Sequence, residues 1–274
     1  MSDFDLIVAD IDGTLINDEK RLSALTIATI RRVRRDFGVD VLLASSRMPQ
    51  SIRQIQIQLG CLDAIVALDG ALVVDGRDDK ADVVLDRRLP VETSRDIVRM
   101  AMNARAHVGI FRGNEWVVGK IDYWTLREIR GNNLMPAVDS LLDRLSIWGD
   151  AQAAAHKIMI RGSASQLRAL RRTMSQFEAQ VLFSFGRPTA MEIVTATAGK
   201  WAGVKFMLDR LGIRPERVMA FGDSDNDFEL LSSVGHGVAP TNASGRIRKV
   251  AREVTLSNAE NGVAAALNKY FPEL

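Results

Sequence analysis

Short apolar runs alternate with amphipathic segments at both ends of the chain, and this alternation constrains the fold more than any other feature. Residues 6–9 form a continuous apolar run, which predicts a strand buried on both faces. The same patterns predict strands over 39–44, 64–68, 218–221 and 237–239, and helices over 23–36, 49–59, 200–211, 225–231 and 259–269. Strand–helix alternation of this kind predicts an α/β fold with a doubly wound, mainly parallel, Rossmann-like core.

The middle of the chain has a different pattern. Two helix-like stretches are mixed there with short strand pairs: helices over 91–105 and 164–177, and strands over 107–111, 115–118, 157–161, 181–185 and 190–194. We interpret residues 83–194 as an α+β cap domain inserted into a core made of residues 1–82 and 195–274. The Asp-rich stretch 75–82 and residues 195–199 are predicted linkers, with hinges near 80–83 and 194–199.

Composition narrows the classes of function. Hydrophobic residues make up 47% of the 274 residues and charged residues 26%, which is the balance of an ordinary globular protein. The net charge of +2 gives no strong attraction to nucleic acid or to a membrane surface, and no apolar stretch approaches the roughly 18 residues of a membrane span. The single cysteine, Cys61, allows no disulfide within the chain. We expect a cytoplasmic protein, monomeric or homodimeric, that binds neither nucleic acid nor membrane. The Arg-rich stretch 31–35 is interpreted as a solvated helix face.

Two acidic clusters follow predicted strands. Asp10 and Asp12 precede Gly13 after the first strand, and Asp223 and Asp227 follow the strand over 218–221. Taken alone, the first cluster is as typical of a polar strand end with an N-capping Asp, or of a calcium-type loop, as it is of a catalytic site, and the second is typical of a helix N-cap. If the four carboxylates converge, each pair about 4 Å apart repels by roughly 4 kcal/mol at an effective dielectric of 20. A divalent cation is therefore expected, and all-oxygen ligands favour Mg²⁺.

Ser45 ends the second predicted strand, and Lys200 begins a predicted helix. A hydroxyl and an ammonium complement the oxygens of a phosphoryl group. Each is common elsewhere in proteins for plain structural reasons, so the pair gains meaning only beside the two acidic clusters.

Four segments together resemble a known family. Asp-Ile-Asp-Gly-Thr-Leu at 10–15, Ala-Ser-Ser-Arg at 44–47, Gly-Lys at 199–200 and Gly-Asp-Ser-Asp-Asn-Asp at 222–227 resemble the four ordered motifs of the haloacid dehalogenase-like hydrolases. The order, the spacing and the segment 261–267 resemble the Cof-type phosphatases, whose cap is inserted between motifs two and three.

The resemblance implies a role for each motif. Asp10 would be the nucleophile that forms an aspartyl-phosphate, and Asp12 would serve first as general acid and then as general base. Magnesium would be held by Asp10, the backbone carbonyl of Asp12 and Asp223, with Asp227 supporting it indirectly. The substrate-binding residues implied are Gly13, Ser45, Ser46, Lys200 and Asn226.

The function expected is Mg²⁺-dependent hydrolysis of small phosphorylated metabolites, with sugar phosphates as the expected class. A phosphosugar mutase and a non-catalytic phosphometabolite-binding regulator are the alternatives; the second carboxylate, Asp12, disfavours the regulator. Ser45-Ser46 stands where the family usually has Thr-Gly, and Asp69 where it usually has Asn. Asp69 is interpreted either as a turn residue or as a carboxylate that alters substrate choice.

Other side chains carry weaker signals. Trp116, Tyr123 and Trp124 are interpreted as residues of the core or of a domain surface rather than as the lining of a sugar or aromatic pocket. His107, His156 and His236 lack metal-ligand spacing and are interpreted as structural. Arg161 and Arg187, near strand ends of the inserted region, are candidate contacts to a remote anionic group of the substrate.

Overall fold

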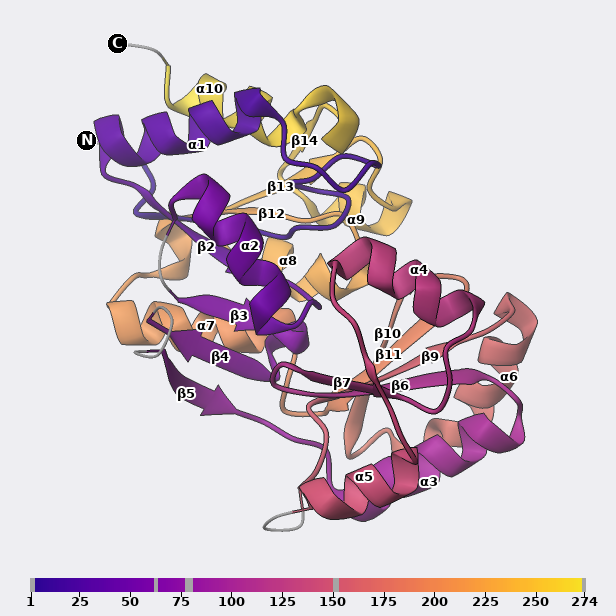
Figure 1. Cartoon of the computed structure of the whole chain (residues 1–274). Helices are drawn as coiled ribbons and strands as arrows, with labels where there is room; N and C mark the ends of the chain where they lie inside the picture. The colour runs from indigo at the N-terminus through magenta and orange to yellow at the C-terminus, as the bar shows by residue number, and fades with distance from the viewer. Residues whose placement is uncertain (1–2, 62–63, 77–80, 150–152, 273–274) are drawn as a thin grey trace.

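Two sheets of different character organise the chain (Figure 1). The computed structural model describes residues 3–61, 64–76, 81–149 and 153–272. The first sheet has the strand order β14-β13-β12-β1-β2-β3-β4-β5, and the second has the order β10-β11-β9-β6-β7-β8. Segments from both ends of the sequence build the first sheet, and the intervening segment builds the second. Within the described residues, no helix is long and apolar enough to cross a membrane.

The first sheet is mainly parallel, as predicted. Its strands are β1 (Leu6–Ala9), β2 (Asp40–Ala44), β3 (Ile65–Ala67), β4 (Leu72–Asp75), β5 (Asp82–Asp86), β12 (Val218–Phe221), β13 (His236–Pro240) and β14 (Glu253–Thr255). Every neighbouring pair from β14 to β3 is parallel, whereas β4 and β5 add an antiparallel edge. The carboxyl ends of β12, β1 and β2 therefore lie side by side at one edge of the sheet.

Helices cover both faces of this sheet because its strands are apolar on both faces. In β1, Ile7 and Ala9 pack into one hydrophobic cluster, and Leu6 and Val8 pack into another. The first cluster includes side chains of α1 (Ala24–Phe37), α2 (Pro49–Leu59) and α10 (Gly262–Tyr270). The second includes side chains of α7 (Lys200–Leu211), α8 (Phe228–Ser233) and α9 (Gly245–Val250). The doubly wound architecture expected from the sequence is confirmed.

The second sheet has one covered face and one face turned toward the first sheet. Its strands are β6 (His107–Arg112), β7 (Glu115–Val118), β8 (Ala137–Val138), β9 (Lys157–Arg161), β10 (Val181–Arg187) and β11 (Ala190–Thr195). Helices α3 (Val91–Asn103), α5 (Leu141–Trp148) and α6 (Ala164–Thr173) share a separate hydrophobic cluster with one face of this sheet. Helix α4 (Tyr123–Asn132) lies on the face of the second sheet that is turned toward the first sheet (Figure 1). There, the Ser51 hydroxyl donates to the carbonyl of Asn132.

The prediction that residues 75–82 form a linker between domains is wrong. Residues 82–86 form β5, which pairs with β4 in the first sheet, so this stretch joins two antiparallel strands; residues 77–80 lie outside the described part of the chain. Val84 and Leu85 of β5 pack against a hydrophobic cluster of the first sheet, and the aspartates of β5 belong to the hairpin rather than to a domain boundary. The chain crosses between the sheets after Asp86 and again at 196–199, where Arg87 donates to the carbonyl of Thr197. The hinge expected near 80–83 therefore falls inside the first sheet.

Several predicted elements have different bounds in the structure. The helix expected over 225–231 is a 3-10 turn followed by α8, and the helix expected over 259–269 starts at Gly262. The strands β4, β5, β8 and β14 and the helices α4, α5 and α9 were not predicted from the sequence. Most of these are short, and six of the seven have eight residues or fewer.

Candidate active site

The four motifs meet at the carboxyl edge of the first sheet. Adjacent strands β12, β1 and β2 continue directly into Gly222–Asp223, Asp10–Asp12 and Ser45–Arg47, and Lys200 begins α7 close by. Ligands of open parallel sheets bind outside this edge, so the topology gathers these residues where chemistry is expected.

Lys200 joins two of the aspartates. Its Nζ atom donates to Oδ1 of Asp10 at 2.8 Å and to Oδ1 of Asp227 at 2.6 Å, and all three side chains are buried. Burial raises the pKa of Asp10 well above its ordinary value, and the carboxylates of Asp227 and Asp223 add to this while Lys200 opposes it. Burial by itself would lower the pKa of Lys200, but Asp10 and Asp227 raise it above its ordinary value. Lys200 is therefore held as a cation among carboxylates.

Asp10, Asp223 and Asp227 each bring a carboxylate oxygen within 4.8 Å of the others. Burial and the nearby Asp227 raise the pKa of Asp223 to about 7. Both oxygens of Asp227 are already bonded, since Oδ2 accepts from the backbone N–H groups of Asp223 and Ser224 at 3.1 Å. Asp10 and Asp223 each keep an oxygen that accepts no hydrogen bond from the described residues. Two free carboxylate oxygens in a cluster short of positive charge fit a hard cation such as Mg²⁺.

Gly13 brings the loop after β1 against Asp223. Its φ is +82°, and a Cβ atom at this position would lie 2.4 Å from Oδ2 of Asp223. Any side chain here would occupy the space of that carboxylate. The glycine of the first motif is thus required for the two acidic loops to approach each other.

Asp12 is held by two cations. Its oxygens accept hydrogen bonds from Nε and Nη2 of Arg47 at 2.6 and 2.9 Å and from Nζ of Lys20 at 2.5 Å. Burial opposes ionisation, but Arg47 and Lys20 together hold the pKa of Asp12 well below its ordinary value. Neither cation was assigned a role from the sequence. Arg47 stands in the second motif, which was the available signal, whereas nothing in the sequence marks Lys20.

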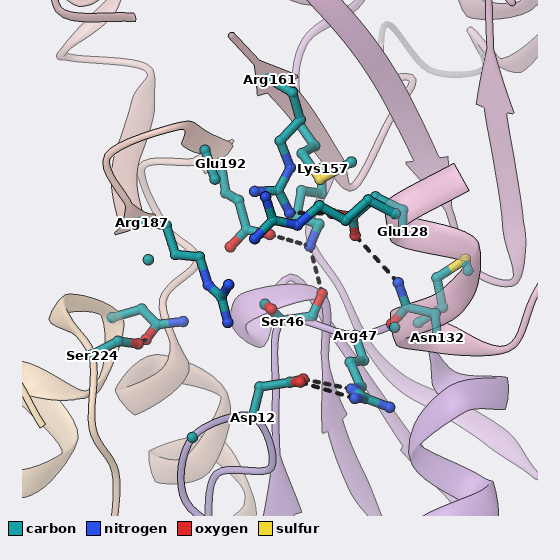
Figure 2. A pocket seen from close by; sticks show the side chains of 18 of the residues that line it. Asp12, Ser46, Arg47, Glu128, Asn132, Lys157, Arg161, Arg187, Glu192 and Ser224 are labelled. Carbon is teal, nitrogen blue, oxygen red and sulfur yellow. Dashed lines mark hydrogen bonds and ion pairs between the residues drawn. The ribbon is translucent and has the colours of Figure 1, made fainter. Parts of the chain in front are cut away.

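A cavity of about 320 Å³ lies between the two sheets, directly above this edge (Figure 2). Asp10, Asp12 and Asp223 contribute to its floor. Strand β9 contributes its alternate residues Lys157, Met159 and Arg161, while the intervening Ile158 and Ile160 pack on the opposite face of the second sheet. The period-2 alternation of a strand therefore presents two cations from the second sheet to the acidic site below.

The other predicted site residues fall into two groups. Gly13, Ser46 and Asn226 line the cavity, whereas Ser45 and Lys200 are buried below its floor. The Ser45 hydroxyl accepts the backbone N–H of Arg47 at 3.2 Å. Asn226 donates its amide to Oδ1 of Asp69 at 2.8 Å.

Asp69 occupies a strained and buried position. It has a left-handed backbone (φ 57°), and its Oδ2 has no hydrogen-bond partner among the described residues. Burial and the Glu192 carboxylate raise the pKa of Asp69 to about 6. Lys157 lies 4.0 Å from Oδ2 of Asp69, and it donates to the carbonyl of Ser46 at 2.5 Å and to Glu192 at 2.9 Å. These contacts tie the second sheet to the loop after β2.

The three aromatic residues singled out in the sequence, Trp116, Tyr123 and Trp124, are not among the residues that line the cavity. Trp116 is buried and stacks on Phe111 with ring centroids 5.9 Å apart, whereas Tyr123 is exposed; Phe111 itself reaches the cavity. The three histidines lie elsewhere as well, each 3.0 Å from one carboxylate: His107 from Asp122, His156 from Asp86 and His236 from Glu253. Arg161 and Arg187 do line the cavity.

Comparisons with known proteins agree with this geometry. A 5-amino-6-(5-phospho-D-ribitylamino)uracil phosphatase of Bacillus subtilis is 28% identical over 273 residues, covering 97% of either chain. An HMP-PP phosphatase of Serratia proteamaculans is 26% identical, covering 89% of this chain and 86% of that protein. The crystal structure of a haloacid dehalogenase-like hydrolase from Bacteroides thetaiotaomicron superimposes with a TM-score of 0.84 at 25% identity, covering 98% of this chain and all of that one.

A family model described as haloacid dehalogenase-like hydrolase matches residues 7–267, which is nearly the whole chain. The match spans the four motifs and the inserted second sheet, and it confirms the Cof-type resemblance drawn from the motifs. The chain belongs to the haloacid dehalogenase-like hydrolase family.

Proposed function

We propose that this protein is a magnesium-dependent phosphatase that hydrolyses small phosphorylated metabolites, sugar phosphates among them, through an aspartyl-phosphate on Asp10. One observation carries the proposal. Asp10 is hydrogen-bonded to Lys200, lies within a cluster of carboxylates, and forms part of the floor of the cavity between the two sheets. A carboxylate in this position can attack a phosphoryl group placed in the cavity.

The reaction proceeds in two steps. An oxygen of Asp10 attacks phosphorus and forms the new P–O bond as the bond to the leaving alkoxide breaks. Asp12 gives the alkoxide a proton, and as a carboxylate it then takes a proton from the water that attacks the phosphoryl-Asp10 bond. The hydrogen bonds from Arg47 and Lys20 favour the carboxylate form that the second step needs. Inorganic phosphate leaves, and Asp10 is restored.

Asp10 and Asp223 would hold Mg²⁺ together with the backbone carbonyl of Asp12, and Asp227 would position the loop that carries Asp223. When bound, the ion would neutralise the charge of the transferring phosphoryl group. Lys200 supplies a fixed positive charge from beneath Asp10. The remaining contacts to the phosphoryl oxygens would come from Gly13, Ser46 and Asn226, which line the cavity, and from Ser45, which is buried below its floor and would have to be reached by the bound phosphate.

We propose that residues 87–195 form the substrate-selecting cap, a range that begins after β5. The cap side of the cavity is built from β6, β9, β10, β11 and α4, none of which carries one of the four motifs. The names of the two relatives, both phosphatases of phosphorylated small molecules, support this class of substrate.

We further propose a cytoplasmic monomer or homodimer, in keeping with the one buried thiol of Cys61.

Nitrophenyl phosphate tests the proposal most simply. The purified protein is incubated with this ester and Mg²⁺, and phosphate release is measured beside a matched sample containing EDTA. We expect release that depends on Mg²⁺ and disappears in the Asp10→Asn variant. The exposed Asp209, which lies on α7 away from the cavity, gives the control Asp209→Asn, which should match the wild type. Phosphate release that survives Asp10→Asn would contradict the proposal.

A further inference from the structure

The wall of the cavity opposite the reaction centre is strongly cationic. Beyond the motifs of the first sheet, the residues of the second domain that line it include five cations and two anions: Arg127, Arg130, Lys157, Arg161 and Arg187, against Glu128 and Glu192. Cations from α4, β9 and β10 thus line one cavity, although the net charge of the whole protein is only +2.

Two of these cations are neutralised within the wall. Lys157 donates to Glu192 at 2.9 Å, and Arg161 is bonded to Glu128 (Figure 2). Both pairs are largely buried, with side chains no more than 15% exposed. In each pair the charge of the cation is cancelled by its glutamate, so these two pairs add no net charge to the wall.

Arg127, Arg130 and Arg187 have no such partner. None of the three makes a hydrogen bond or an ion pair with another residue in the described part of the chain. In Figure 2 the guanidinium of Arg187 extends into the cavity between Ser46 and Ser224. Three unpaired guanidinium groups around one cavity form an attractive field for an anion.

The reacting phosphate does not account for this surplus. On the floor, Asp12 is bonded to both Arg47 and Lys20, and Lys200 faces Asp10 from below. The cavity lining as a whole has seven cationic and five anionic side chains before any metal is added. A divalent cation on the floor would match a phosphate dianion, which leaves the guanidinium groups of the wall without a counter-ion.

We propose that the cavity binds a second anionic group of the substrate, a phosphate or a carboxylate, at the end remote from the phosphate that is cleaved. Arg187, Arg130 and Arg127 are the residues that recognise it. Guanidinium groups bind both kinds of oxyanion through paired N–H donors, so the shared chemistry is that of a planar or tetrahedral oxyanion. This inference rests on the proposed phosphatase function and specifies its substrate class.

Matched substrate pairs test it. Fructose 1,6-bisphosphate is compared with fructose 6-phosphate, and 6-phosphogluconate with glucose 6-phosphate, by kcat/KM in Mg²⁺. We expect at least a tenfold preference for the doubly anionic member of one pair or of both; the first pair reports a second phosphate and the second pair a carboxylate. The preference should shrink as ionic strength rises, because the added contact is electrostatic. Equal kcat/KM within both pairs would overturn the inference.

Variants locate the effect. Arg187→Gln and Arg130→Gln should each reduce the preference at least tenfold, mainly through KM, and Arg187→Lys should restore part of it. Arg168 is an exposed cap arginine outside the cavity, so Arg168→Gln is the control and should keep the full preference. A preference unchanged in both glutamine variants would refute the assignment. Turnover of nitrophenyl phosphate separates the two proposals: if it proceeds with Mg²⁺ while no preference exists, only the second anionic site is wrong.

Discussion

The Nζ atom of Lys200 lies 2.8 Å from Oδ1 of Asp10, although 190 residues separate the two in the sequence. The segment that builds the second sheet accounts for most of that separation, because the chain leaves the first sheet after β5 and returns just before α7. The return places a fully buried ammonium beneath the carboxylate at the end of the central strand β1. The contact therefore forms only when α7 packs against the first sheet, so folding of the first sheet and assembly of the site are coupled.

Lys200→Met should destabilise the protein strongly. The substitution keeps much of the side-chain volume but leaves the buried carboxylates of Asp10 and Asp227 without their cation, which typically costs about 3–5 kcal/mol of unfolding free energy. Urea unfolding at pH 7 in EDTA measures the loss. Lys205→Met on the same helix breaks only an exposed pair with Asp209 and should cost less than about 1 kcal/mol. Adding Asp10→Asn to Lys200→Met should recover part of the stability; a further loss would contradict the assigned ion pair.

Mg²⁺ should stabilise the protein and Asp223 should be needed for this. A ligand present at 100 times its Kd adds about 2.7 kcal/mol to the unfolding free energy, so thermal unfolding after EDTA treatment should shift upward when Mg²⁺ is returned. Asp223→Asn should abolish the shift, whereas Asp225→Asn, an exposed neighbour in the same loop, should retain it. Ca²⁺ is expected to bind without supporting turnover, because its larger and more flexible coordination shell can engage both oxygens of Asp10. An equal Mg²⁺ shift in Asp223→Asn would place the ion elsewhere.

Asp12→Asn should lower kcat by roughly 10²–10⁴-fold on alkyl phosphates, the usual range for loss of a general acid–base group. Nitrophenyl phosphate has a leaving group that needs little protonation, so its loss should be smaller. Steady-state kinetics on both esters gives the comparison. Equal losses would count against proton donation by Asp12. The asparagine should still accept a hydrogen bond from Arg47, so the fold is expected to be retained.

Asp69 should make stability depend on pH. The pKa of Asp69 is raised from 3.8 to about 6 by burial and by Glu192, against the opposing charges of Lys157 and Lys200 and the hydrogen bond from Asn226. A raised pKa means that the folded state holds this proton more tightly, so the associated stability is present below pH 4 and is lost as pH rises through 6. About two pKa units correspond to roughly 3 kcal/mol.

Asp69→Asn should remove that dependence. Asparagine tolerates the left-handed backbone and can accept the same hydrogen bond from Asn226, so the variant is expected to fold. Its unfolding free energy relative to the wild type should rise by about 2–3 kcal/mol between pH 4 and pH 7. The exposed control Asp209→Asn should show no comparable trend. A constant difference between Asp69→Asn and the wild type across this range would show that Asp69 is ionised normally.

The core of the fold could be predicted because its signals are local. The helix over 200–211 and the strand over 218–221 were predicted with the bounds that the structure has, since an amphipathic or apolar run followed by Gly212 or Gly222 marks each end. The β5 strand was missed because its aspartates resemble a loop, and only pairing with β4 shows that it is a strand. Long-range pairing of a polar edge strand leaves little trace in the sequence.

The acidic floor of the site could be predicted for the same reason that the sheet could: Asp10, Asp12 and Asp223 follow buried parallel strands. The roof could not. Lys157 and Glu192 meet only because β9 and β11 pair in antiparallel register, and Lys20 reaches Asp12 from a loop with no motif. Arg187 was named from its place near a strand end, but Arg127 and Arg130 lie on α4, which was not predicted. Residues that converge through tertiary packing carry no common spacing in the sequence.

Formation of the phosphoenzyme on Asp10 is the central claim, and chemical trapping tests it most directly. The protein is mixed with a ³²P-labelled phosphomonoester and Mg²⁺, quenched in acid within milliseconds, reduced with borohydride and digested for mass spectrometry. An aspartyl-phosphate is reduced to homoserine, so we predict label that is stable to acid and lost in hydroxylamine, and homoserine at position 10. The Asp10→Asn variant should acquire neither. Turnover with no trapped label, or label on any residue other than Asp10, would contradict the account.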